Sequence, residues 1–183
     1  MKDWLLVIGM APNVMEDLQK LGDLSRFDKM VITHTNKDFK VDNIQYLVSH
    51  QADFEVAKAF RAQNGLNTDY ITYSTDAYPG VMNVFPQFRG PTCSFSCNPR
   101  LPSRDPRNHH HYSGSSALLG VKIGLLLGYK KVVVAGVALS GRYKAFQKGW
   151  AWYAPVLQRC PIRAVSGYLA AMLGPFTEVW LNE

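Results

Sequence analysis

The sequence predicts an α/β protein, with one domain over residues 1–183 in which a mostly parallel, open sheet is flanked by helices. Short apolar runs alternate with segments of helical periodicity along most of the chain. The chain has 183 residues, close to the ~150 typical of one domain. Apolar residues make up 47% and charged residues 19% of the chain, which suits a packed core and argues against a disordered tail, a coiled coil or a solenoid.

The first predicted strand and helix lie at the amino-terminal end. Trp4–Ile8 is a continuous apolar run of the kind that forms a buried parallel strand. A helix is expected to follow Asn13, which can cap it, because Glu16 stands three residues later in a capping-box arrangement. Gly22 is expected to end this helix.

Four more strands and one helix are predicted before residue 86. The strands are expected at 29–34, 44–49 and 69–74, with a short fifth strand at 81–85. Residues 52–63 have the pattern of an amphipathic helix. Its inward side chains are expected to be Val56, Ala57 and Phe60, and its outward side chains Lys58, Arg61 and Gln63.

A long irregular basic loop is predicted at about 86–112. It shows no sustained periodicity and holds half of the chain's ten prolines. Its cationic side chains are Arg89, Arg100, Arg104, Arg107 and the run His109, His110 and His111. A loop of this length is typical either of a functional lid, for which arginine is suited to bidentate phosphate binding, or of a solvated variable loop.

The second half of the chain is predicted to alternate helix and strand again. These elements are expected at 117–128, 132–137, 145–157, 162–165 and 168–173. The first of them is apolar on nearly every face, so a buried helix is expected, and Gly120 and Gly124 would let a strand approach it closely. Ser166 is expected to cap the last helix and Gly174 to end it.

Charge and composition narrow the classes of partner. Lys plus Arg is 20 and Asp plus Glu is 14, giving a formal net charge of +6, which favours phosphates, nucleotides or nucleic acid as partners. The longest apolar runs are too short for a membrane span. Three cysteines without the spacing of a disulfide framework predict a reduced, cytoplasmic protein. No metal site is predicted, because adjacent histidines cannot all face one ion and Cys93 and Cys97 lack partner ligands.

The turn after the first strand is one candidate for ligand binding. In an open parallel sheet, ligands bind beyond the carboxyl ends of the strands, where small residues let backbone N–H groups approach a phosphate or a ribose. The sequence does not have the three glycines of the dinucleotide fingerprint, so no NAD site is predicted, and an ordinary tight turn is the alternative. The turn consists of Gly9, Met10, Ala11, Pro12 and Asn13.

The start of the apolar helix is the second candidate. Hydroxyl groups and N–H groups at a helix amino terminus form an anion site, although the same residues would also serve as a plain cap. The basic loop directly before it favours anion binding. His34 and His50 end predicted strands at the ligand-binding edge, so they are candidate acids or bases, with a structural histidine as the alternative. The segment comprises Tyr112, Ser113, Gly114, Ser115 and Ser116.

These motifs resemble a superfamily of Rossmann-like proteins. The residues that carry the likeness are SGSSAL at 113–118 and LLLGYKKVVVAGV at 125–137, and the first turn looks like the family's G-x-[GA]-P-S turn. Members include bacterial sialyltransferases of the Campylobacter lipooligosaccharide type, motility accessory factors and archaeal 6-hydroxymethylpterin diphosphokinases. The tail at 163–167 and 178–181 is similar to small phage and prophage members of unknown function. The resemblance covers most of the chain and implies a single Rossmann-like domain.

The resemblance also implies a phosphorylated, nucleotide-like ligand between the first turn and the Ser-Gly segment. Polar residues after the second and third strands would add contacts. Tyr112 and Tyr143 would correspond by position to the family's leaving-group tyrosines. Ala138 stands where relatives carry an aspartate, which favours ligand binding over catalysis. The added contacts would be Thr35 or Asn36, and Ser49 or His50.

Three functions remain open from the sequence. The first is a transferase acting on a nucleotide-activated sugar or diphosphate donor, in which Ser115, Ser116 and arginine side chains stabilise the departing phosphate. In this hypothesis the candidate bases are His50 and His111, and Tyr112 is a further candidate catalytic residue. The second is a non-catalytic nucleotide-binding module. The third is a nucleic-acid binder using 89–107, which lacks a helix-turn-helix and aromatic residues interleaved with the arginines. No cofactor is assigned.

Overall fold

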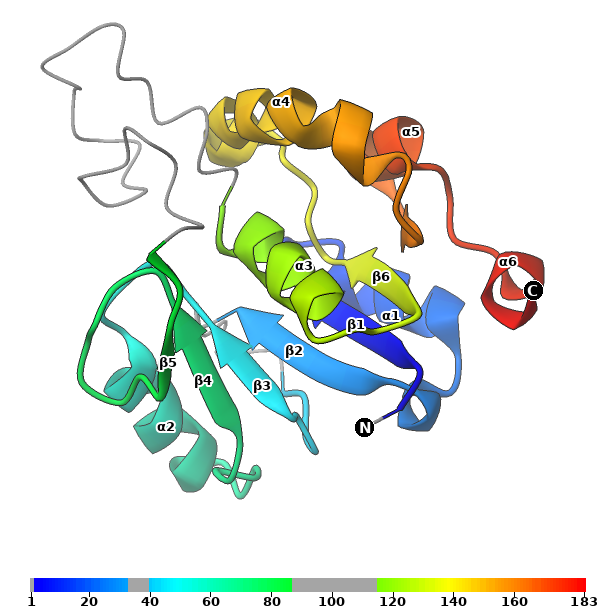
Figure 1. Cartoon of the computed structure of the whole chain (residues 1–183). Coiled ribbons are helices and arrows are strands. Elements are labelled where there is room, and N and C mark those ends of the chain that lie inside the picture. Colours follow the sequence, from blue (N-terminus) through cyan, green and yellow to red (C-terminus); the bar gives the residue numbers. More distant parts are fainter. Residues whose placement is uncertain (1, 33–39, 87–114) are drawn as a thin grey trace, which may run out of the picture.

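The computed structural model describes residues 2–32, 40–86 and 115–183, in which seven strands form one sheet. The strand order is β5-β4-β3-β2-β1-β6-β7, and each neighbouring pair is parallel (Figure 1). The predicted α/β architecture is confirmed as Rossmann-like. The strands are β1 Trp4–Ile8, β2 Asp28–Ile32, β3 Tyr46–Val48, β4 Ile71–Ser74, β5 Asn83–Val84, β6 Lys131–Ala135 and β7 Ile162–Ala164.

Helices cover both faces of the sheet (Figure 1). One face packs against α1 Val14–Leu21, α2 Phe54–Gln63 and α6 Glu178–Asn182. The other packs against α3 Ser116–Leu126, α4 Gln147–Leu157 and α5 Gly167–Leu173. Two 3₁₀ helices, η1 Leu24–Arg26 and η4 Gly141–Phe146, complete the described elements. The chain builds the sheet outward from β1 to β5 on one side and from β6 to β7 on the other, so the strand order reverses between β1 and β6.

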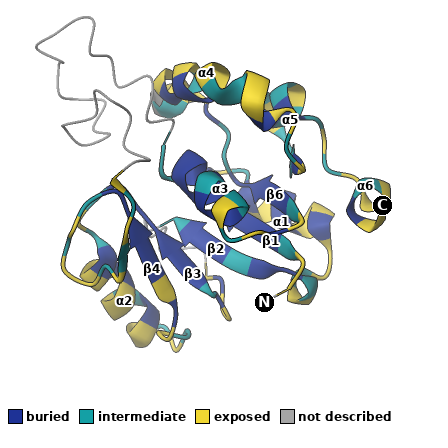
Figure 2. Ribbon diagram, in the orientation of Figure 1, coloured by how far each residue is buried: buried dark blue, intermediate teal, exposed yellow. Residues whose placement is uncertain are grey.

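The continuous apolar runs of the sequence correspond to strands that are buried on both faces. Leu5 and Val7 contact the helices of one face, and Leu6 and Ile8 contact those of the other, all with 0% exposure. Figure 2 shows the same burial along the central strands, with the exposed residues on the outer sides of the helices. Burial of this kind is typical of parallel sheets and explains why no polar alternation appears in these strands.

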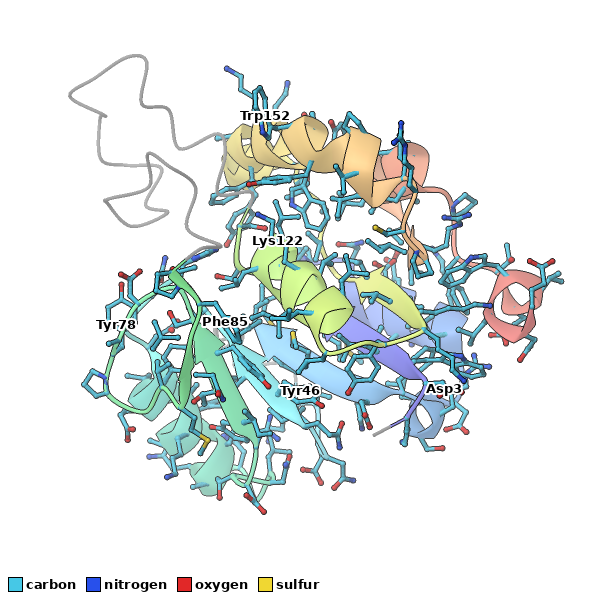
Figure 3. The ribbon with its side chains drawn as sticks, viewed as in Figure 1. Asp3, Tyr46, Tyr78, Phe85, Lys122 and Trp152 are labelled. Carbon is cyan, nitrogen blue, oxygen red and sulfur yellow. The ribbon has the colours of Figure 1, made fainter. Side chains whose placement is uncertain are left out.

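The predicted buried helix is α3, which lies diagonally across the sheet in Figure 1. A Cβ added at Gly120 would lie 3.1 Å from Met30 Sδ and 3.2 Å from Val7 Cγ1, and one added at Gly124 would overlap Leu5. The prediction that these glycines allow strands to approach closely is therefore confirmed. On the outer side, Lys122 reaches α4, where its Nζ lies 3.6 Å from the centre of the Tyr153 ring (Figure 3).

The inward face of α2 differs from the prediction. Phe54, Ala57 and Arg61 are buried, whereas Val56 is 65% exposed. The buried residues follow the i, i+3, i+7 spacing of a helical stripe, and Arg61 can join it because backbone carbonyls lie within its reach. The expected outward position of Arg61 and inward position of Val56 were therefore wrong.

The helix ends also differ in detail. α1 and α5 begin after Asn13 and Ser166 and are followed by Gly22 and Gly174 as predicted. Neither capping side chain accepts from a backbone N–H group of its own helix, and Asn13 Nδ2 donates to Ser166 Oγ at 2.8 Å. The expected capping box is therefore wrong, and these side chains join two helix starts. The sequence prediction also missed α6, a short helix after the expected last one.

No helix in the described segments is long and apolar enough to span a membrane. The predicted irregular loop at 86–112 lies outside the described residues except for Pro86.

Buried tyrosines at the amino edge of the sheet predict a loss of stability at alkaline pH. Tyr129 donates to Asp28 Oδ2 at 2.6 Å and lies 2.8 Å from the Tyr46 hydroxyl. Burial, with a further contribution from the Asp28 hydrogen bond, raises the pKa of Tyr129, and burial also raises the pKa values of Tyr70 and Tyr73. Figure 3 shows Tyr46 of this group on the sheet.

In the unfolded chain these phenols ionise near pH 10, while the folded chain keeps its protons to higher pH. The contribution of these tyrosines to the free energy of unfolding is therefore expected to be constant below about pH 9.5 and to fall as the pH rises further. Tyr129→Phe should reduce the slope of the free energy of unfolding against pH in this range by up to ~1.4 kcal/mol per pH unit. Urea unfolding between pH 8 and about 11.5 measures this, and equal slopes for the two proteins would contradict it.

Candidate functional site

The reversal of strand order places a candidate site beyond the carboxyl ends of β1 and β6. In doubly wound sheets the loops after such strands diverge, and ligands bind at this point. The turn Gly9–Asn13 follows β1, and residues Gly136 to Ala138 follow β6. The structure thus brings the first predicted turn to the edge where a ligand is expected.

The turn is tied directly to the end of β6. Gly9 N donates to Ala135 O at 2.8 Å, and Ala11 N donates to Gly136 O at 2.9 Å. A Cβ at Gly9 would lie 2.5 Å from Val137 Cγ2 and still closer to Gly136 O, so only glycine fits there. The amides of Gly9 and Ala11 already donate to β6 and to Gly136, and Pro12 has no N–H group. The amides of Met10 and Asn13 are therefore the ones that this turn could direct at a ligand.

A buried carboxylate on α1 holds the turn Gly9–Asn13 in place. Asp17 on α1 is 1% exposed, and its Oδ2 accepts from Gly136 N at 2.8 Å and from Asn13 Nδ2 at 3.1 Å. Since Asn13 Nδ2 also donates to Ser166 Oγ, the hydrogen-bonded pair Asp17 and Asn13 links the starts of α1 and α5 to the end of β6. Asp17 was not among the predicted site residues, although its position four residues after Asn13 on the helix was a visible signal.

A second polar cluster lies at the carboxyl ends of β3 and β4, on the same edge of the sheet. Its side chains are buried although they are polar, and they are Ser49, His50, Ser74 and Thr75. His50 N donates to Ser116 Oγ at 3.3 Å, which fixes the first turn of α3 to the end of β3. Ser115 Oγ accepts from Trp150 Nε1 at 3.4 Å, which fixes the same turn to α4. The start of α3 is therefore held at the carboxyl edge from two sides.

His50 is buried within this cluster, with 7% exposure. Its Nδ1 lies 3.0 Å from Thr75 Oγ1, and its carbonyl accepts from the Tyr78 hydroxyl at 3.4 Å. Tyr78 lies on the connection between β4 and β5 (Figure 3). The ring is thus held by its neighbours rather than projecting into solvent.

The first turn of α3 has the chemistry to attract an anion. The helix has 11 residues, and the partial positive charge of its dipole lies at Ser116, at the carboxyl edge of the sheet. Amides in the first turn of a helix have no carbonyl partner within the helix, so they can donate to phosphate oxygens. Ser115 precedes them with a φ of 95°, an unusual angle for a residue other than glycine.

The other predicted site residues are distributed as follows. Tyr143 lies on η4 and stacks on Phe146, with ring centres 6.3 Å apart, and so serves a packing role. Ala138 follows β6 beside the start of α5, where it offers no functional group. Among the described residues, no three His, Cys, Asp or Glu side chains gather where they could hold a metal ion. The predicted residues outside the described segments are His34, Thr35, Asn36, His111, Tyr112, Ser113 and Gly114.

Comparison with protein-family models, with curated proteins and with solved structures gave no match for this chain.

Proposed function

We propose that the protein binds a phosphorylated, nucleotide-like ligand at the carboxyl edge of its sheet. The ligand would lie between the turn Gly9–Asn13 and the first turn of α3 at Ser115 and Ser116. The observation that carries this proposal is the reversal of strand order between β1 and β6 in an all-parallel sheet, since ligands of this fold class bind at such a point. The α3 amino terminus at the same edge would supply N–H donors for phosphate oxygens.

The resemblance to the Rossmann-like transferase superfamily suggests which ligand this would be. A nucleotide-activated sugar or a diphosphate donor would satisfy both turns, and its transfer to an acceptor would be the reaction. We also propose that the chain belongs to that superfamily and is similar to its phage and prophage members.

A non-catalytic nucleotide-binding module is the second candidate function. Two observations favour it over the enzyme. Ala138 supplies no carboxylate at the end of β6, and the His50 ring is buried rather than open to a substrate. Both candidates share the same ligand site, so one set of binding experiments tests them together.

Thermal unfolding in the presence of CMP, CDP, UDP and CMP-sialic acid tests the binding proposal. A nucleotide at 100 times its dissociation constant adds about 2.7 kcal/mol to the apparent stability, so the melting temperature should rise by several degrees. Pro12→Glu, which adds a negative charge on the exposed part of the first turn, is expected to weaken binding at least tenfold.

Pro161→Glu is the matched control, because Pro161 is also exposed but precedes β7 at the opposite edge of the sheet. It should leave the nucleotide shift unchanged. Equal binding by both variants would contradict the proposed location, and no shift with any of the four nucleotides would overturn the proposed function. Hydrolysis of CMP-sialic acid by the wild-type protein would support the enzyme, whereas binding without turnover would support the module.

A further inference from the structure

Helix α4 exposes apolar side chains on its outer side. Its inner side is buried against the rest of the fold through Gly149, Trp150 and Leu157. On the outer side Trp152 is 64% exposed and Val156 is 62% exposed, and Figure 3 shows Trp152 on the side of α4 that lies away from α3. Side chains four residues apart are neighbours on a helix surface, so these two form one patch.

Positive charges flank this patch on the same side of the helix. Lys148 precedes Trp152 by four residues, and Arg159 follows Val156 by three in a turn that continues the helix, since Arg159 N donates to Val156 O at 3.1 Å. Lys148 and Arg159 are exposed, and neither makes an ion pair with a residue that the structure describes. The α4 outer face consists of Lys148, Trp152, Pro155, Val156 and Arg159, all of them exposed.

The part of the chain that surrounds this face has no negative side chain. The sequence contains no aspartate or glutamate between Asp105 and Glu178. This stretch includes α3, η4, α4 and α5, whose buried residues belong to one hydrophobic cluster. Lys144 on η4 is exposed and adds a further positive charge just before α4. The net charge of +6 is therefore unevenly distributed, and no carboxylate on these helices offsets the cations of the α4 outer face.

An exposed indole ring with aliphatic neighbours and flanking cations fits the surface of an anionic lipid bilayer. Tryptophan is favoured at the boundary between headgroups and acyl chains, because its ring is apolar while its N–H group can reach water or headgroups. Lysine and arginine beside it are attracted to anionic headgroups. A helix with this division of side chains lies in the plane of the bilayer surface with its apolar groups inserted.

Two other partners fit this face less well. A nucleic acid would gain base stacking from Trp152 alone, because Pro155 and Val156 have no aromatic ring. A second copy of the chain related by a twofold axis would place the same face against itself, which brings like charges together. An anionic bilayer has neither disadvantage, since it accepts the aliphatic groups and carries the opposite charge.

We propose that the α4 outer face binds the surface of anionic phospholipid bilayers. Trp152 and Val156 insert between the headgroups, and Lys148 and Arg159 contact lipid phosphates. This interaction does not depend on the nucleotide site, because none of these residues belongs to that site.

Sedimentation of the full chain with vesicles tests the binding. Vesicles of phosphatidylcholine and phosphatidylglycerol in equal parts should bind the protein at least about tenfold more tightly than vesicles of phosphatidylcholine alone. Raising the NaCl concentration from about 50 to about 500 mM should weaken that binding severalfold, because salt screens the attraction. Equal binding to both kinds of vesicle, or no binding to either at the lower salt concentration, would overturn the proposal.

Matched variants test which residues carry the interaction. Trp152→Ser removes the inserted ring and should weaken binding to the anionic vesicles about tenfold, and Lys148→Gln removes one charge and should weaken it about fivefold. Val56→Ser and Lys58→Gln are the controls, because both residues are exposed on α2, which covers the opposite face of the sheet, and they should bind like the wild type. If Trp152→Ser does not fold, Val156→Ser against Val56→Ser gives the same contrast.

Fluorescence reports insertion of the ring itself. The chain has four tryptophans, so the Trp152 signal is the difference between the wild type and Trp152→Phe. Anionic vesicles with brominated acyl chains should quench the wild type more strongly than Trp152→Phe. Equal quenching of the two proteins, or vesicle binding by Trp152→Ser equal to that of Val56→Ser, would contradict the proposed contact. Binding to single-stranded DNA that Trp152→Ser abolishes, without any binding to vesicles, would assign this face to nucleic acid and overturn the proposal.

Discussion

Gly9→Ala is expected to lower the free energy of unfolding by about 3 kcal/mol, because the added methyl group has no space. Its Cβ would lie 2.5 Å from Val137 Cγ2 and closer still to the carbonyl oxygen of Gly136. That carbonyl accepts from Ala11 N and belongs to the backbone, so it cannot rotate away as a side chain could. The turn would have to separate from β6. Urea unfolding followed by circular dichroism measures the loss.

Gly120→Ala is the control for this variant. Its Cβ would lie 3.1 Å from Met30 Sδ and 3.2 Å from Val7 Cγ1, so these side chains need to move by only a few tenths of an ångström and no backbone atom is in the way. Alanine also favours the helix by about 1 kcal/mol over glycine, so the net change should stay within about 1 kcal/mol of wild type. Equal losses for the two variants would contradict the close contact between the first turn and β6.

Arg61→Met is expected to destabilise the fold by about 3 kcal/mol, even though sequence periodicity placed Arg61 on the solvent side of α2. The side chain is 5% exposed, and its Nη1 and Nε donate to the carbonyls of Val41 and Asn67 at 2.9 and 2.7 Å. Its guanidinium also lies over the Tyr70 ring, 5.5 Å from the centre. Methionine would fill the space of the stem but leave the buried Val41 carbonyl and the half-buried Asn67 carbonyl without these donors.

Lys58→Met on the same helix is the matched control, because Lys58 is exposed and its replacement should change stability by less than about 0.5 kcal/mol. Arg61→Lys keeps the charge but cannot bond to both carbonyls in the same fork-like geometry, so an intermediate loss is expected. If thermal and urea unfolding of Arg61→Met match those of Lys58→Met, the bonds from Arg61 to the carbonyls of Val41 and Asn67 do not stabilise the fold.

Much of the fold could be predicted from the sequence because its strands are buried on both faces. Trp4–Ile8 and residues 132–135 of β6 appear in the sequence as continuous apolar runs, and the chain around them alternates strand with helix. The glycines of α3 indicated its close packing on the sheet, since a helix packed directly on strands needs small residues at the contact. These features follow from local composition and spacing.

What the sequence could not provide depends on partners distant along the chain. Arg61 is buried because the carbonyls of Val41 and Asn67 face it, and no periodicity reveals acceptors outside the helix. Asp17 is bonded to Gly136, 119 residues away. Thr75 meets His50 only because β3 and β4 are neighbours in register. In each case the strand order had to be known before the contact could be inferred.

Mapping the bound nucleotide onto the backbone tests the central claim most directly. Amide ¹H–¹⁵N spectra of the wild-type protein, recorded during titration with CMP and then CDP, report which residues change environment. The proposed site predicts that the largest changes fall on Met10, Asn13, Ser116 and Gly136, all at the carboxyl edge of the sheet. Changes confined to the amino edge around Tyr129 and Lys131, or no saturable change with either nucleotide, would contradict the claim.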